Sequence, residues 1–264
     1  MGKFGLIASS NPILFGALRM GILFLCLAPF CNLKIPPKKY FLPLFGFSIC
    51  MGAGVNMFLY LSIDAASILA PITIGAQLSI PFAIILSSLF LGESINFKKW
   101  ILIFTSFLGI ILIAFDPKIS EEILAIILVF AMAFFYGLSQ AFSRYLRELD
   151  VKFTSAFMGF VGFVVLVAIS QFVEGNVINQ IKNIDRDGWV AIFYAGMIIS
   201  IFGHMMMFYL YKFYPVGMVL PFYALFPVFG LLLTFLIFGE IPTLIMVTGG
   251  IIVITSVFLL NKTR

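Results

Sequence analysis

The amino-acid sequence predicts an all-α, polytopic membrane protein, and two observations carry the prediction. Hydrophobic residues make up 62% of the 264 positions and charged residues only 10%, whereas a soluble globule of this size has roughly a quarter of its residues charged. The apolar residues also fall into long runs separated by short polar dividers. Backbone groups in lipid must be hydrogen-bonded within the chain, so these runs are expected to be transmembrane helices.

Nine runs reach the ~20 mostly apolar residues that a transmembrane helix needs. In chain order they cover 11–31, 41–63, 66–91, 98–115, 120–143, 153–173, 188–211, 214–238 and 241–260. Helix breakers separate several of them: Pro36-Pro37 after the first run, Gly92 after the third and Asp116-Pro117 after the fourth. The polar stretch 174–187 separates the sixth run from the seventh.

Basic residues are distributed unevenly over the dividers, which predicts an orientation. Taking the C-terminal side as inside, the inside segments hold Lys34, Lys38, Lys39, Lys98, Lys99, Arg144, Arg147, Lys152, Lys212, Lys262 and Arg264. The outside segments hold Lys3, Lys118, Lys182 and Arg186. We therefore expect a cytoplasmic C-terminus, an outside N-terminus and a place in a bacterial inner (plasma) membrane. The scattered clusters also argue for lipid contact and against a nucleic-acid partner.

Two stretches of the chain resemble each other. Phe90-Leu91-Gly92-Glu93 closes one span and Ile237-Phe238-Gly239-Glu240 closes another, with Pro71 and Pro221 upstream. Lys98-Lys99 follow the first stretch, whereas Pro242 and no nearby basic residue follow the second. The equivalent sites are therefore expected on opposite sides of the membrane. This pattern is typical of an inverted repeat, which in transporters places the substrate near the midplane between the halves.

The order and spacing of several short motifs resemble those of the EamA family of the drug/metabolite transporter superfamily. The motifs are Asn11-Pro12, Ala17-Leu18-Arg19 and the paired Gly-Glu closings. The resemblance spans nearly the whole chain. It implies ten helices in two inverted five-helix halves, here 1–115 and 116–264, and transport of an amino acid, a derivative or a similar polar solute.

The resemblance also implies that Pro12–Arg19 begins the second helix of the family fold. The chain is then expected to lack most of the first helix and to keep only a tail at Gly5–Ser10. Nine spans leave the N-terminal half one helix short. We therefore expect that the reading frame begins upstream, or that another chain or lipid fills the slot.

No soluble-enzyme motif is present, so we expect neither an enzyme nor a cofactor. There is no phosphate-binding Gly-rich loop ending in Lys-Ser/Thr, and the single histidine excludes a pair of His metal ligands. An integral membrane enzyme would need clustered ionisable residues at one membrane surface. The loops here are too short and plain for that. We therefore expect a secondary transporter that moves a small-molecule substrate by alternating access, with a non-transporting integral membrane subunit or scaffold as the alternative. A homodimer is also left open.

Polar side chains inside spans are costly and therefore mark candidate substrate contacts. The candidates are Gln77, Asn56, Tyr60, Tyr136, Gln140, His204 and Tyr223. Neutral groups of this kind suit a zwitterionic or polar uncharged solute, and the alternative is ordinary bonding between helices. Gln77 lies between Pro71 and Pro81, where a kink would free backbone carbonyls. His204 could couple transport to protons; the resemblance, which implies an aromatic residue there, favours packing.

Three charged residues are expected to be structural. Glu93 and Glu240 each sit just before a helix, where a carboxylate accepts backbone N–H bonds. Arg19 is the one clear intramembrane cation, and it could bind an anionic substrate group. Snorkelling or bonding to backbone carbonyls is the simpler interpretation. The resemblance supports it, because arginine recurs at this place in the family as a structural element.

Overall fold

The computed structural model describes Leu6 and residues 11–31, 36–92, 95–117, 122–205, 226–239 and 241–262. Within these ranges the chain is helical throughout and contains no strand, which confirms the predicted all-α, polytopic membrane architecture. Six of the helical stretches are long and apolar enough to cross a bilayer: Pro12–Phe30, Lys38–Ala65, Ala70–Phe90, Phe97–Ala114, Ile123–Tyr145 and Val151–Val173. Two shorter apolar helices cover Pro227–Phe238 and Leu244–Leu260.

The elements follow in chain order. They are α2 (Pro12–Leu27), η1 (Ala28–Phe30), η2 (Lys38–Tyr40), α3 (Phe41–Phe47), η3 (Ser48–Gly54), α4 (Val55–Ala65), α5 (Ala70–Gly75), η4 (Ala76–Leu78), α6 (Ser79–Leu91), α7 (Phe97–Ala114), α8 (Ile123–Tyr145), α9 (Val151–Val173), α10 (Val177–Asn183), α11 (Arg186–Phe193), η6 (Tyr194–Met205), α14 (Phe226–Phe238) and α15 (Leu244–Lys262). The sequence did not predict α10, which lies within the polar divider 174–187.

Several helices begin where a side chain caps the first free N–H groups. Asn96 Oδ1 accepts from Lys99 N at 2.9 Å at the start of α7, and Asp185 Oδ1 accepts from Gly188 N at 2.7 Å at the start of α11. The start of α2 is capped from a distant element instead. Glu174 accepts from Ile13 N at 2.7 Å and from Leu14 N at 3.0 Å, which fixes the end of α9 to the beginning of α2.

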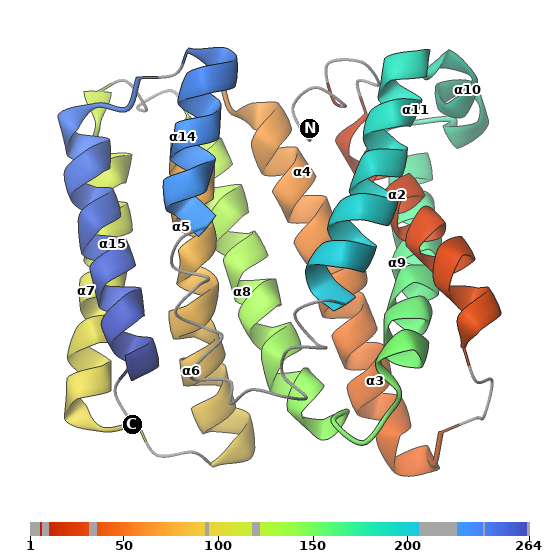
Figure 1. The fold of residues 1–264 in the computed structure, drawn as a ribbon, viewed down its shortest axis with the longest axis horizontal. Coiled ribbons are helices and arrows are strands. Elements are labelled where there is room, and N and C mark those ends of the chain that lie inside the picture. The colour runs from red at the N-terminus through yellow and green to blue at the C-terminus, as the bar shows by residue number, and fades with distance from the viewer. Residues whose placement is uncertain are drawn as a thin grey trace.

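Two helices, α6 and α14, have the same C-terminal turn at opposite ends of the bundle. Gly92 after α6 and Gly239 after α14 both have φ +67°, the left-handed conformation that favours glycine at a helix end. Each N–H bonds the carbonyl four residues earlier, Ser88 O or Phe235 O, at 3.0 Å. Figure 1 shows α6 ending at the lower edge of the bundle and α14 at the upper edge. The two equivalent turns therefore have inverted orientations.

A constant separation relates the two parts of the chain. Gly92 and Gly239 are 147 residues apart, as are the first residues of α6 and α14 (Ser79 and Phe226) and those of α7 and α15 (Phe97 and Leu244). The same shift carries η3 into η6 and α2 onto the second half of α9. Both η3 and η6 are π-helical, a rare conformation.

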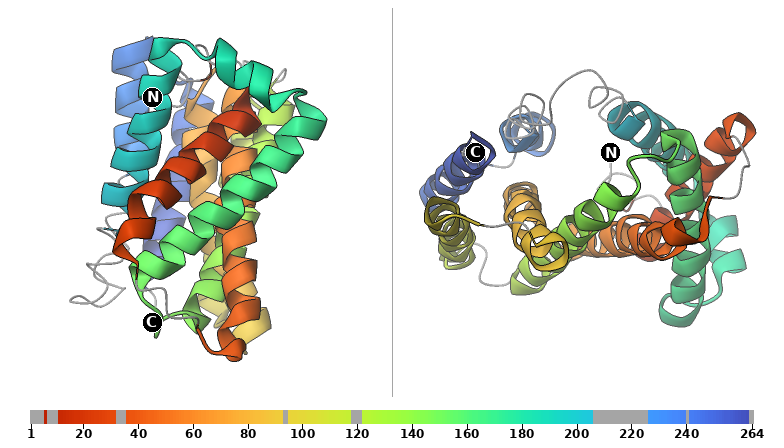
Figure 2. Two further views of the ribbon diagram at one scale, coloured as in Figure 1. Left: turned by 90° about the vertical axis from the view of Figure 1, so that its right-hand side faces the viewer. Right: turned by 90° about the horizontal axis from the view of Figure 1, so that it is seen from below.

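The most extensive helix contacts join each element to its own counterpart, α2 to α9 and α7 to α15. Figure 2 (left) shows α2 and α9 side by side at a shared tilt. Glycine permits the close approach at α7–α15. A Cβ on Gly109 would lie 2.9 Å from Gly249 O, and one on Gly249 would lie 2.7 Å from Gly109 O. Self-pairing of this kind is what a two-fold axis between inverted halves produces.

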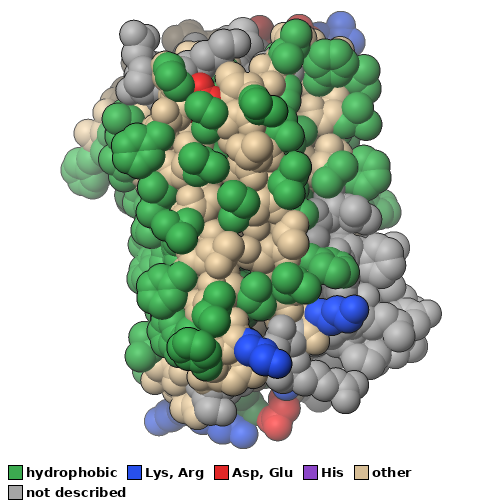
Figure 3. Space-filling view, turned by 90° about the vertical axis from the view of Figure 1, so that its left-hand side faces the viewer, with side chains coloured by type: hydrophobic (Ala, Val, Ile, Leu, Met, Phe, Trp, Pro, Cys, Tyr) green, Lys and Arg blue, Asp and Glu red, His purple; other side chains and the backbone are tan. Residues whose placement is uncertain are grey.

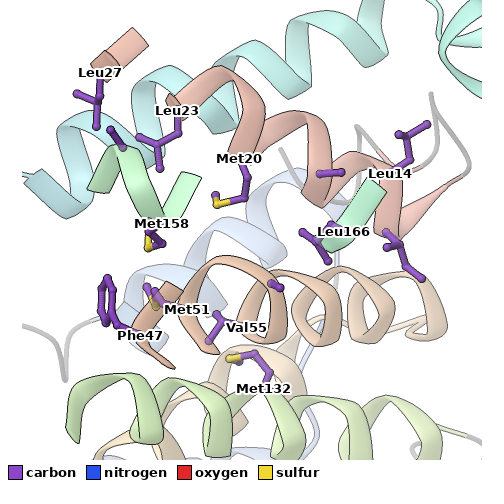
Figure 4. Packing of buried hydrophobic residues seen from close by; sticks show 14 of the residues in the cluster. Leu14, Met20, Leu23, Leu27, Phe47, Met51, Val55, Met132, Met158 and Leu166 are labelled. Atoms are coloured by element: carbon purple, nitrogen blue, oxygen red, sulfur yellow. The ribbon is translucent and has the colours of Figure 1, made fainter. Parts of the chain in front are cut away.

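The main core lies between α2, α4, α8 and α9. Met20, Val55, Met132 and Leu166, one from each of these helices, belong to this one cluster of buried side chains (Figure 4). The outer surface is apolar as well. On the face formed by α7 and α15, Figure 3 shows hydrophobic side chains over most of its height, with basic side chains mainly at the lower end. This face suits contact with lipid tails.

Candidate functional site

The intramembrane polar cluster is centred on Arg19. This residue lies near the middle of α2, about 10 Å along the axis from its first residue at 1.5 Å per residue, and only 7% of it is exposed. Gly16 keeps the neighbouring turn narrow, since a Cβ there would lie 3.3 Å from Tyr60 Cδ2 and 3.5 Å from Asn56 Cβ. The helix α4 can therefore come close enough for its polar side chains to reach the guanidinium.

Three neutral side chains accept hydrogen bonds from Arg19. Nη1 donates to Asn56 Oδ1 at 3.1 Å and to Tyr60 Oη at 3.0 Å, both on α4. Nε donates to Ser200 Oγ at 3.0 Å, on η6. All three partners are buried. Arg19 is therefore not snorkelling. It bonds side chains rather than the backbone carbonyls suggested by the simpler interpretation of the sequence.

Asn56 links the guanidinium to the π-helical segment η3. Its Nδ2 donates to Met51 O and Gly52 O, both at 3.0 Å, and its Oδ1 accepts from Arg19. Both carbonyls belong to η3, so the amide ties this π-helical segment to the first turn of α4. Asn56 thus holds the irregular turn and orients Arg19 at once.

Ser200 plays the same part on the other side of Arg19. Its Oγ accepts from Arg19 Nε and donates to Ala195 O, five residues back in η6. A Cβ on Gly196 would lie 2.8 Å from Ile22 Cβ and 3.1 Å from Arg19 O, so glycine lets η6 lie directly against α2. The guanidinium therefore bridges α4 and η6 directly. Asn56 extends this link to η3, the π-helical segment that the 147-residue shift makes equivalent to η6.

The charge of Arg19 is not neutralised within the described part of the chain. No Asp or Glu side chain there pairs with the guanidinium. The Tyr60 ring lies under it, with Cζ 5.9 Å from the ring centroid, and packs edge-on against Phe15 at 4.7 Å. A ring at this distance offsets only part of a cation's desolvation cost.

A second buried polar group lies on the prolyl segment between α5 and α6. Gln77 is 4% exposed and its Oε1 has no hydrogen-bond partner. Its backbone carbonyl cannot accept from the residue four positions on, because Pro81 has no N–H, and it accepts from Ser79 N instead. The helix narrows to the 3₁₀ turn η4 here, as the flanking prolines predict. One unpartnered acceptor, the side-chain Oε1 of Gln77, thus lies at a break in the helix.

The remaining predicted residues do not join the Arg19 cluster through any described contact. Tyr136 and Gln140 are half-buried on α8, where Tyr136 packs against the main core. His204 lies in η6, but its side chain is outside the described part of the structure, as are Tyr223, Glu93 and Glu240. The segment expected to be a remnant of the first helix is likewise outside it, except for Leu6, which is buried against the cluster around Phe15.

Sequence reasoning missed Ser200 and the carboxylates that hold helix starts. A serine in an apolar run carries no signal, because it usually bonds its own helix's carbonyls. Glu122 accepts from Ser67 N at 3.2 Å and Ile68 N at 3.4 Å, before α5, much as Glu174 does before α2. Glu174 lies in the divider 174–187 and Glu122 at the start of the run 120–143, and neither position indicated these distant contacts.

Each end of the bundle carries a polar tie between distant segments. At the upper end Thr243 Oγ1 donates to Asp116, joining the beginning of α15 to the end of α7. At the lower end Tyr40 Oη donates to Glu148, with Lys39 Nζ 3.8 Å from the same carboxylate. The Tyr40 hydrogen bond and the charge of Lys39 lower the pKa of Glu148.

Comparison with known proteins gives a family and a fold. The model of the EamA-like transporter family matches residues 1–115 and 123–262. A solved crystal structure is similar with a TM-score of 0.58 at 16% sequence identity, over 99% of this chain and 96% of the other. At that identity the likeness concerns the fold alone. No curated protein matches the sequence.

Proposed function

Since the chain belongs to the EamA-like transporter family and is a polytopic helical membrane protein, we propose that it is a secondary transporter that works by alternating access. Its substrate is a small metabolite: an amino acid, a derivative or a similar polar solute. The chain carries out no covalent chemistry on the solute.

The observation that carries the proposal is the buried cluster around Arg19. It lies at mid-span and draws on both halves, with α2 and α4 from residues 1–115 and η6 from residues 116–264. Polar groups are kept at this depth when they face a pathway or a partner. Irregular backbone within a membrane is tolerated where it is buried in protein or lines a cavity, and the cluster sits between two such segments.

The inverted relation of the halves supports the proposed mechanism. Two units of the same fold with opposite orientations can exchange conformations, so that the site opens to one side and then to the other. The ties Asp116–Thr243 and Tyr40–Glu148 lie at opposite ends of the bundle. In this mechanism one of them opens when the site faces its side of the membrane.

The proposed orientation has the C-terminus in the cytoplasm of a bacterial cell, with the protein in the inner membrane. In the described residues, the helix ends at the lower edge of Figure 1 carry Lys38, Lys39, Lys98, Lys99, Arg144, Arg147, Lys152 and Lys262. Those at the upper edge carry only Lys182 and Arg186. By the positive-inside rule, this distribution supports an orientation with the lower edge in the cytoplasm.

Release of solutes from proteoliposomes tests the proposal. Vesicles that contain the purified protein are loaded with a mixture of amino acids and related metabolites, and the solutes retained are measured by mass spectrometry against protein-free vesicles. We expect one solute or a small chemical class to leave faster and chemically unchanged. If no solute leaves faster, the protein is a subunit or scaffold; if a new product appears, it is an enzyme.

A further inference from the structure

We propose that Arg19 and Tyr60 bind the carboxylate of the transported solute, an inference that rests on the transport function above. The site is the side of the guanidinium that faces neither Asn56 nor Ser200. The argument starts from the hydrogen-bonding groups that the cluster leaves unused.

Each acceptor around Arg19 already accepts one hydrogen bond. Asn56 Oδ1 accepts from Nη1, and Ser200 Oγ accepts from Nε while its own proton goes to Ala195 O. Both protons of Asn56 Nδ2 go to backbone carbonyls. Asn56 and Ser200 therefore have no hydrogen left to donate to a ligand, and only Arg19 and Tyr60 do.

The hydrogens that remain unused all belong to Arg19 and Tyr60. A guanidinium has five N–H groups, and three of them are used through Nε and Nη1. The two N–H groups of Nη2 have no hydrogen-bond partner among the described residues. The described residues also do not bury Nη2 completely. Tyr60 Oη accepts from Nη1, and its own proton has no described acceptor. Unused donors around a cation favour a ligand that accepts hydrogen bonds.

The charge of the site selects the class of acceptor. Arg19 is a buried cation, and the described residues provide no anion to pair with it. An unpaired charge in a low-dielectric interior is costly. A ligand that carries one negative charge pairs with Arg19 and also accepts hydrogen bonds from its unused donors. A carboxylate matches the single positive charge, whereas a phosphate dianion would leave an excess buried charge. Guanidinium and carboxylate also form strong charge-assisted hydrogen bonds.

Thermal unfolding of the purified protein with matched probes tests the site. The probes are the common amino acids and small monocarboxylates, each compared with its primary amide, together with inorganic phosphate. We expect at least one acid to raise the Tm, its amide to leave the Tm unchanged, and phosphate to have no effect. An amide that stabilises as well as its acid overturns the proposal, as does stabilisation by phosphate alone or by no acid.

Variants locate the binding on these residues. Arg19→Gln should abolish the Tm shift produced by the acid. Tyr60→Phe, which keeps the ring against Phe15, should weaken the acid's affinity about tenfold, as expected for the loss of one hydrogen bond to a charged group. Ser200→Ala is the matched control, because it removes a partner of Arg19 and no unused donor, and should weaken the affinity less than Tyr60→Phe does. An unchanged affinity in folded Tyr60→Phe overturns the assignment.

Failure of the carboxylate site can be distinguished from failure of the transport function. If the proteoliposomes release a neutral solute at the same rate with wild-type protein and with Arg19→Gln, the transporter proposal stands and the carboxylate site is wrong. If no solute is released at all while an acid binds at Arg19, the site stands and the transport function is wrong.

Discussion

At the scale of single residues, Arg19 and Gln77 show two ways of keeping a polar group in a membrane helix. Arg19 has a bonded partner on each of two neighbouring elements, α4 and η6. Gln77 has an enclosed Oε1 with none. A buried acceptor without a partner costs about 1–3 kcal/mol, so its presence is explained by something other than stability. A ligand N–H that reaches Oε1 during transport would explain it.

Replacing Gln77 by leucine should therefore separate stability from function. We expect Gln77→Leu to unfold at the same Tm as the wild type or a higher one, since the substitution removes an unpartnered acceptor. The solute flux from proteoliposomes should fall at least tenfold, a fall that about 1.4 kcal/mol of lost binding free energy produces.

Asn56→Leu is the matched control for Gln77→Leu. It removes bonds to Arg19, Met51 and Gly52, so its Tm should drop clearly. A Tm of Gln77→Leu as low as that of Asn56→Leu, with normal flux, would make Gln77 a structural residue.

The sequence could indicate some of these residues and not others. Asn56, Tyr60 and Gln77 were predicted because polar side chains are costly at membrane depth. That Asn56 and Tyr60 meet Arg19 could not be predicted, because it depends on how α2 and α4 cross. Ser200 could not be predicted at all, since a hydroxyl in an apolar helix normally bonds its own backbone.

At the scale of elements, glycines set the distances between paired helices. On α15, Gly249 faces backbone: a Cβ there would lie 2.7 Å from Gly109 O and 2.5 Å from Ile113 Cγ1. The next residue, Gly250, faces only the end of the Ile74 side chain, at 3.1 Å from Cδ1. The helix α7 cannot yield as a side chain can. The α7–α15 contact therefore depends on Gly249 more than on Gly250.

Alanine substitutions at these two neighbours should differ in sign or size. Both gain up to about 1 kcal/mol of helix propensity. Gly249→Ala also forces α7 and α15 apart, at a cost of roughly 1–3 kcal/mol, so its Tm should fall. Gly250→Ala should leave the Tm near that of the wild type. Equal Tm values for the two variants in thermal denaturation would show that the close contact is not needed.

The tie at the lower end gives a dependence on pH. The Tyr40 hydrogen bond and Lys39 lower the pKa of Glu148, so the ionised form is favoured in the folded protein. The stabilisation is present above the ordinary glutamate value of 4.5 and is lost as the pH falls through the lowered folded value. We expect the Tm of wild type to exceed that of Glu148→Gln at pH 7 and the difference to close below pH 4.5. A difference that is constant with pH would contradict this.

At the scale of the whole molecule, the inverted repeat was partly visible in the sequence. The Gly-Glu closings predicted equivalent turns on opposite sides, and Gly92 and Gly239 share one conformation at opposite ends of the bundle. The equivalence of η3 and η6 could not be predicted, because their sequences differ and π-helical turns have no sequence signal as clear as a glycine cap. The prolines that seemed to match, Pro71 and Pro221, are 150 residues apart and so do not follow the 147-residue shift.

The orientation of the molecule in the membrane follows from its two ends and can be tested directly. In Figure 1, α10 lies at the upper end and α7 begins at the lower end. Asn179 on α10 and Lys98 at the start of α7 are both exposed. In a background with Cys26, Cys31 and Cys50 replaced by serine, Asn179→Cys should react with a membrane-impermeant maleimide in intact cells. Lys98→Cys should react only after the cells are broken, because eight of the ten described basic residues at the helix ends lie on its side. The reverse labelling pattern would place the basic end outside and overturn the proposed orientation, whereas the internal inverted relation of the halves, which depends only on the fold, would be unaffected.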